Sequence, residues 1–136
     1  MELHKSIAVI LVGAAALAPA FGAELLPRLA DIIGQKTTAL SDAEREIIDG
    51  WSPAKKIAEF FCQDRALAEL KGEFSDADRV FLELEASDPP PELVSATRVA
   101  GVGSVRHGAD WTDFSYECEI DPETAEAIDF RYEAKP

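Results

Sequence analysis

Apolar residues recur at helical spacing in the first half of the chain and at alternate positions in the second half. Over residues 25–33 they return every three or four positions, and Gly34 is predicted to end this first helix. The segment 41–44, Ser-Asp-Ala-Glu, has the pattern of a capping box, so a short second helix is expected to run to Gly50. Residues 23–50 are therefore expected to form a helical lead, which either drapes over the domain or stays mobile.

The segment 53–71 has the clearest helical pattern of the chain. Ser52 is the expected N-cap, Pro53 suits the first helical position and Gly72 suits the exit from the last turn. Cys62 lies close to the edge of the apolar stripe of this helix, which is formed by Ile57, Phe60, Phe61, Leu67, Ala68 and Leu70.

After this helix the apolar period changes from about 3.6 residues to two. Apolar and polar residues alternate in the segments 80–85, 114–120 and 128–134, which predicts half-buried strands. A glycine-rich strand is expected over 97–106. Three consecutive prolines at 89–91 predict a stiff, extended loop, because proline has no N–H group to donate to a sheet.

Turns and glycines complete the predicted fold. Gly101 and Gly103 allow a bulge or a close approach of another backbone segment, and the segment 107–110 is expected to form a turn. Strands with one apolar and one polar face are typical of an antiparallel sheet packed on one side. We therefore predict an α+β domain over 51–136, with an antiparallel sheet of about four strands covered on one face by the 53–71 helix.

The first residues have the parts of a secretory signal peptide over 1–22. Lys5 precedes an apolar run at 7–18, and small residues follow, with cleavage expected after Gly22 or Ala23, or earlier after Ala20. The run is too short for a membrane span of about 20 residues, so no stable span is expected after cleavage. An uncleaved anchor or a buried core helix is the alternative. A cleaved signal peptide predicts a periplasmic or secreted protein.

The charge balance is strongly acidic, with 26 Asp and Glu against 13 Lys and Arg and a net charge of −13. The expected signal peptide contains one residue of each sign, Lys5 and Glu2, so the mature chain keeps this net charge. An acidic field disfavours nucleic acids and anionic lipid surfaces. It favours a basic envelope protein as partner, although the charge could also serve solubility alone.

Two cysteines, Cys62 and Cys118, lie in the expected mature part. An even number of cysteines in an oxidising compartment predicts a disulfide, which would join the helix to the sheet because Cys118 shares a strand face with Phe114 and Tyr116. A crosslink of this loop length stabilises by about 4 kcal/mol on the chain-entropy model. The alternative is a pair of buried free thiols.

Few residues suggest catalysis. His107 is the only histidine beyond the expected signal peptide, and it could act with Asp110 or Asp113 as an acid/base couple, or lie exposed in a turn. Trp111 could be a ligand platform or an anchor of the sheet edge. No serine lies in a nucleophile elbow, and no glycine loop has the pattern of a phosphate site.

No metal or other cofactor is expected. Two cysteines and one histidine, without Cys-x-x-Cys spacing, do not make a zinc set. A cluster of acids could bind calcium loosely, but the solvent face of a strand explains it better. Its members are Glu117, Glu119, Asp121, Glu123 and Glu126.

A glycine-rich stretch at 101–108, followed by Trp111 and an aromatic strand containing Cys118, resembles the domain of unknown function 930 family. This family consists of exported alphaproteobacterial proteins, mainly rhizobial, without an assigned activity. Cys62 in its helix and the closing strand around 127–130 also fit, so the likeness covers roughly residues 55–134. Gly103-Ser104 replaces an Ala-Phe pair of the family, two residues instead of fewer precede Trp111, and this chain is more acidic. The resemblance implies a two-cysteine framework and export.

Two classes of function follow from these observations. The first is a non-enzymatic interaction module of the periplasm or the extracellular space, since nearly every patterned residue has a structural explanation. The second is an envelope enzyme or small-ligand binder that uses His107, Asp110 and Asp113 near Trp111.

Overall fold

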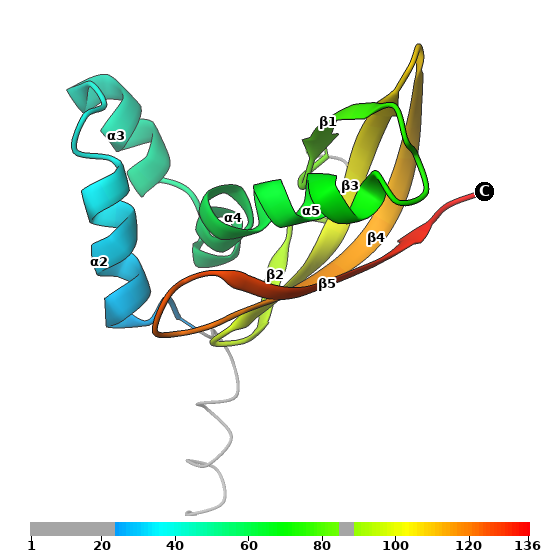
Figure 1. The fold of residues 1–136 in the computed structure, drawn as a ribbon. Helices are drawn as coiled ribbons and strands as arrows, with labels where there is room; N and C mark the ends of the chain where they lie inside the picture. Colours follow the sequence, from blue (N-terminus) through cyan, green and yellow to red (C-terminus); the bar gives the residue numbers. More distant parts are fainter. Residues whose placement is uncertain (1–23, 85–88) are drawn as a thin grey trace, which may run out of the picture.

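A computed structural model describes residues 24–84 and 89–136 (Figure 1). The expected signal peptide, 1–22, lies outside the described residues. The elements in chain order are α2 (Pro27–Lys36), α3 (Asp42–Asp49), α4 (Pro53–Ile57), the π-helical turn η3 (Ala58–Cys62), α5 (Gln63–Leu70), β1 (Ala77–Phe81), β2 (Glu92–Ser95), β3 (Arg98–His107), β4 (Asp110–Ile120) and β5 (Ala127–Ala134). The strands form one antiparallel sheet with α4, η3 and α5 on one face, which confirms the predicted α+β class.

The first two helices follow the predicted capping signals, with one difference. Ser41 and Glu44 form the expected capping box, in which the Glu44 N–H donates to Ser41 Oγ over 3.1 Å. The prediction that Gly34 ends the first helix is wrong, because α2 continues to Lys36. A glycine inside a helix costs only about 1 kcal/mol, and burial of the preceding Ile33 favours continuing the helix.

The helical lead is part of the core. Leu29 is fully buried and Ile33 nearly so, and both belong to the same apolar cluster as Ile57 under the sheet. In Figure 1, α2 and α3 flank the N-terminal end of α4. Residues 23–50 were expected either to drape over the domain or to stay mobile, and the described part of this segment packs on the domain.

The predicted 53–71 helix is present but not regular. Ser52 accepts a hydrogen bond from the Lys55 N–H at 3.1 Å and Pro53 opens α4, as expected. Within the helix, the π-helical turn η3 separates α4 from α5 and was not predicted. Its wider hydrogen-bonded turn accommodates an extra residue. Phe61 and Cys62 are both buried there. No helix of the described residues is long and apolar enough to cross a membrane.

The sheet has the order β1-β3-β4-β5, and β2 also pairs with β3. β1 lies opposite residues 104–107 of β3 and β2 lies opposite 98–100, so both occupy the same side of β3. β1 and β2 therefore follow one another along the same side of β3, with a break between them. The predicted strand 80–85 is instead β1, which begins earlier and ends at Phe81, and β2 after the prolines was not predicted.

Gly101 and Gly103 permit the close approach that the sequence predicts. A Cβ atom on Gly103 would lie 2.3 Å from the backbone oxygen of Phe81, and one on Gly101 would lie 2.9 Å from the Tyr116 hydroxyl. This hydroxyl donates a hydrogen bond of 2.7 Å to the Leu82 backbone oxygen. The chain after β1 thus crosses the inner face of β3. Burial of the Tyr116 hydroxyl at this crossing raises its pKa above the ordinary value.

Two connections complete the sheet. The predicted turn joins β3 to β4 in a hairpin with a two-residue loop, in which Gly108 has a φ of +65°. The alternation over 128–134 predicts that Ile128 lies on the apolar, core-facing side of its strand, but it is 53% exposed. A register shift between Glu119 and Ile120 in the pairing of β4 with β5 explains this, because an extra residue turns a side chain to the other face.

A disulfide joins the helical layer to the sheet, as predicted. Cys62 of η3 and Cys118 of β4 are bonded, with their Cα atoms 6.5 Å apart, and both residues are fully buried. No free cysteine remains in the chain.

Candidate functional site

The proposed acid/base residues do not form one cluster. The half-buried His107 ring lies 4.6 Å from the Phe74 ring, centroid to centroid, and its Nε2 lies 2.8 Å from the Thr112 hydroxyl. Asp110 is opposite His107 in the register of β3 and β4, whereas Asp113 precedes the buried Phe114 and so lies on the other face of the sheet. Among the described residues, no hydrogen bond or ion pair joins the His107 ring to either aspartate.

Trp111 lies on the outer face of the sheet, the face opposite the helices. Its ring stacks on that of Phe81, with centroids 5.4 Å apart and planes inclined by 6°. Phe81 of β1 lies opposite Ser104 of β3 and Trp111 of β4 lies opposite Arg106, so the two rings meet diagonally across β3. Both rings are nearly half exposed, at 46% and 45%. Trp111 therefore ties the edge strand to the sheet, as the anchor interpretation expects, and still presents apolar surface to solvent.

An arginine extends this aromatic pair. The Arg106 guanidinium lies 5.9 Å from the centroid of the Trp111 ring, within the range of a cation–π interaction. Arg106 also donates two hydrogen bonds of 2.9 Å to the carboxylate of Asp78 on β1. These bonds hold the pKa of Asp78 below its ordinary value. The result is a fixed strip of aromatic and ionic side chains across three strands.

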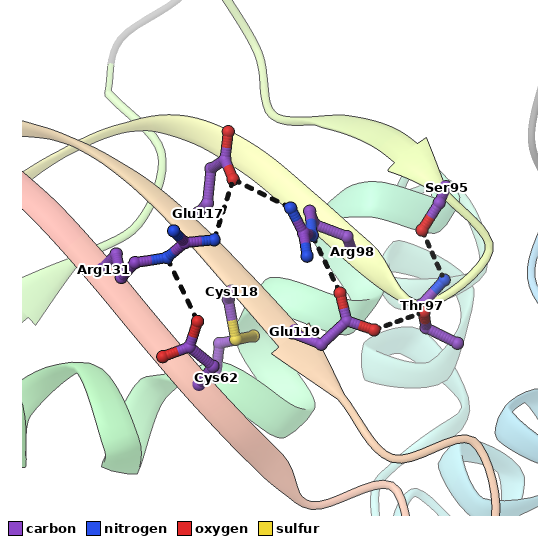
Figure 2. Close-up of polar contacts among 9 residues, drawn as sticks. Cys62, Ser95, Thr97, Arg98, Glu117, Cys118, Glu119 and Arg131 are labelled. Atoms are coloured by element: carbon purple, nitrogen blue, oxygen red, sulfur yellow. Dashed lines mark hydrogen bonds and ion pairs between the residues drawn. A yellow bond between two sulfur atoms is a disulfide. The ribbon is translucent and has the colours of Figure 1, made fainter.

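The other end of the outer face is a network of ion pairs (Figure 2). Glu119 accepts a 2.6 Å hydrogen bond from the Thr97 hydroxyl and a 2.8 Å bond from Arg98 Nε. Hydrogen bonds from Thr97 and Arg98 hold the pKa of Glu119 below its ordinary value. Arg98 and Arg131 both reach Glu117, at 3.3 and 3.8 Å. As Figure 2 shows, the network lies on the opposite side of the sheet from the Cys62–Cys118 disulfide, which bonds β4 to the helical layer.

At the border of this network the outer face is hollowed by about 450 Å³. Small side chains, Ala100 and Ser115, line this hollow together with Glu117, Arg131 and Glu133. Acids outnumber bases on the outer face of β3, β4 and β5. The acids are Asp113, Glu117, Glu119, Asp129 and Glu133, and the bases are Arg98, Arg106 and Arg131. The face thus combines exposed apolar rings with a net negative charge.

A second hollow of about 630 Å³ lies between α2, the central helix and the turn after β4. Ile32, Phe60 and Phe61 contribute apolar lining. The charged lining residues are balanced, two basic and two acidic: Lys36, Arg65, Asp64 and Glu126. This balance gives the second hollow no preference for a partner of either sign.

The acidic cluster considered for calcium is spread out. Among the described residues, no group of three or more His, Cys, Asp or Glu side chains is placed to hold a metal ion. Glu117 and Glu119 lie on the outer face with arginine partners, and the Asp121 carboxylate accepts the Glu123 N–H in the turn after β4. The solvent-face interpretation of these acids fits this placement.

Sequence reasoning identified Trp111 and the outward acids but missed their partners. Phe81, Arg106 and Arg98 reach them only through the pairing of β1, β3 and β4. The one available signal was that Arg98 and Arg106 share a face of the predicted glycine-rich strand, with Arg98 opposite the acid Glu119 of the next strand.

Comparisons with known proteins give no relative of this chain. No protein-family model, no curated protein and no solved structure matches it. The resemblance to the domain of unknown function 930 family therefore stays a hypothesis that rests on the residues of the two-cysteine framework.

Proposed function

We propose that the protein is an exported, non-enzymatic interaction module that binds a basic envelope protein through the outer face of its sheet. The observation that carries this proposal is the combination on that face of half-exposed Phe81 and Trp111 with an excess of carboxylates. An aromatic contact surrounded by charges is typical of protein interfaces. The acid excess is complementary to a basic surface and would speed its association.

Export is the second part of the proposal. A buried disulfide such as Cys62–Cys118 is typical of oxidising compartments and rare in the cytosol. The pattern of residues 1–22 supports the same location, periplasmic or secreted. An enzyme or small-ligand binder built on His107, Asp110 and Asp113 has less support, because Asp113 lies on the opposite face from His107.

Affinity capture from an envelope extract tests the binding surface. The tagged mature protein is expected to retain a discrete basic protein that is released at high salt. The double variant Glu117→Gln/Glu133→Gln removes two carboxylates from the hollow and is expected to retain much less. Glu123→Gln/Glu126→Gln is the matched control, since it removes the same charge from the exposed turn after β4. Equal retention by both double variants, or no retained protein at all, would contradict the proposal.

A further inference from the structure

β5 forms one edge of the sheet and is long for an edge strand. Its eight residues pair with β4 on one side, and no strand of the described residues pairs with it on the other. From Asp129 to Ala134 the register is regular and the sequence contains no proline. Natural proteins usually interrupt such an edge, because unpaired N–H and C=O groups are ready to pair with another chain.

The hydrogen bonds of β5 show which backbone groups face outward. The Lys135 N–H donates to the Asp113 backbone oxygen at 2.9 Å, so residue 135 points toward β4. In an antiparallel ladder the bonded residues alternate, which directs Tyr132 and Ala134 toward the open edge. Arg65 donates to the Ala127 backbone oxygen at 3.1 Å and so covers the beginning of this edge. The part around Tyr132 is beyond that contact.

The outer-face side chains of this strand alternate in sign. Asp129, Arg131 and Glu133 of β5, and Lys135 directly after its last residue Ala134, follow one another at every second position. Suppose that a second copy of the strand runs antiparallel with Tyr132 opposite its counterpart. Arg131 then lies opposite Glu133 of the second copy, and Asp129 lies opposite Lys135, and both pairs occur twice by symmetry. The same register brings the edge-directed backbone groups opposite one another.

Neighbouring registers lose this complementarity. Sliding one strand by two residues, which is the smallest step that keeps the backbone groups opposed, places Arg131 opposite Arg131 or Glu133 opposite Glu133. Directly opposed like charges destabilise a strand pair. A uniformly basic or acidic peptide would also meet like charges at half of the positions. The strand is therefore most complementary to itself.

We propose that two copies of this chain associate through antiparallel pairing of β5 with β5 about Tyr132. The contact is isologous, as in most homodimers, and forms one continuous sheet with both helical layers on the same side. The outer faces of the two copies then join into one surface of twice the width. The dimer requires nothing of the basic partner proposed above, and experiments on the purified protein alone test it apart from the capture of that partner. Because both copies carry a net charge of −13, screening at physiological salt favours the contact.

Sedimentation velocity of the mature protein over a series of concentrations, at physiological ionic strength, tests the dimer. The expected result is a concentration-dependent shift from one to two chain masses. Ala134→Pro removes an N–H group that points to the open edge and not to β4. It is expected to leave a monomer with an unchanged far-ultraviolet circular dichroism spectrum. A wild-type protein that stays monomeric at all concentrations would overturn the proposal.

A charge swap tests the register. Arg131→Glu alone opposes two carboxylates and is expected to weaken the dimer about tenfold or more, the effect of about 1.4 kcal/mol. Arg79→Glu is the matched control, because it makes the same charge change at the opposite edge of the sheet.

The double variant Arg131→Glu/Glu133→Arg restores complementarity within its own dimer but opposes like charges in a mixed dimer with wild type. Native mass spectrometry of the mixture should show the two homodimers and little mixed dimer. Statistical mixing would exclude this register, and thermal denaturation of each variant checks that the fold is kept.

Discussion

Among the glycines that the structure describes, Gly103 has the least space for a side chain. An added Cβ would lie 2.3 Å from the Phe81 backbone oxygen and 2.8 Å from the Phe114 ring, so the backbone itself must move. Gly103→Ala is expected to lower the free energy of unfolding by about 1–3 kcal/mol, the usual cost of overpacking. Gly34→Ala is the control, because no atom lies within 4 Å of its added Cβ and alanine favours the helix by about 1 kcal/mol. Urea denaturation followed by tryptophan fluorescence measures both, and opposite signs are expected.

Glu119 is expected to make stability depend on pH. Hydrogen bonds from Thr97 and Arg98 lower its pKa from the ordinary 4.5 in the folded protein. A lowered folded pKa adds stability above the ordinary value, and this contribution is lost as the pH falls through the folded pKa. The free energy of unfolding of the wild type should thus exceed that of Glu119→Gln by a constant amount near neutral pH, and this difference should shrink below pH 4.5.

Urea denaturation of both proteins between neutral and acidic pH measures this difference. Glu123→Gln serves as the control, because the Glu123 side chain makes no hydrogen bond or ion pair within the described part of the chain. A gap between wild type and Glu119→Gln that does not change with pH would show that the network leaves the titration of Glu119 unaltered.

Among the elements, η3 and β4 are joined by the Cys62–Cys118 disulfide. Cys62→Ala/Cys118→Ala is expected to lower the free energy of unfolding by about 2–5 kcal/mol, as for native disulfides of small domains. Reduction of the wild-type protein should lower its stability in the same direction, and the double variant should not respond to the reductant. A wild-type protein with equal stability in both redox states would refute the prediction.

The helical lead is expected to unfold together with the sheet. Leu29 of α2 is fully buried in the common core, so Leu29→Ala should destabilise the whole domain by about 2–5 kcal/mol in one transition. Ile47 of α3 is 63% exposed, and Ile47→Ala should have little effect. Two separate transitions in thermal denaturation would instead show that α2 folds independently.

The elements with strong local signals were predicted, and those that depend on distant contacts were not. Capping residues and apolar spacing located α3 and the start of α4, and alternation located β4. β2 has only four residues with little burial, so it has no alternating pattern to recognise, and its pairing with β3 defines it. The π-helical turn and the bulge that exposes Ile128 likewise arise from packing and register.

The candidate site could be predicted only in part, for the same reason. Trp111 was visible in the sequence as a tryptophan next to a turn. Its contact with Phe81 requires both the register of β1 on β3 and that of β3 on β4. No local pattern carries that information. The proposed couple of His107 with Asp113 shows the converse, because these two residues are close in sequence but lie on opposite faces of the sheet.

For the molecule as a whole, the proposed export predicts that the mature chain starts at a defined residue. The exported protein is expected to begin at Ala23 or Glu24, or earlier at Phe21, since small residues precede all three sites. Intact mass spectrometry of protein from the envelope or the medium measures this start. A mass that still includes residues 1–20 would contradict the signal peptide.

The presence of one cysteine pair simplifies oxidative folding. Cys62 and Cys118 are the only cysteines of the chain, and 56 positions separate them. A chain with four cysteines can form three connectivities, but this one has a single intramolecular isomer. Shuffling by a disulfide isomerase can therefore improve nothing within one molecule. The remaining error is a bond between two molecules, so the yield of correctly oxidised protein should depend on dilution.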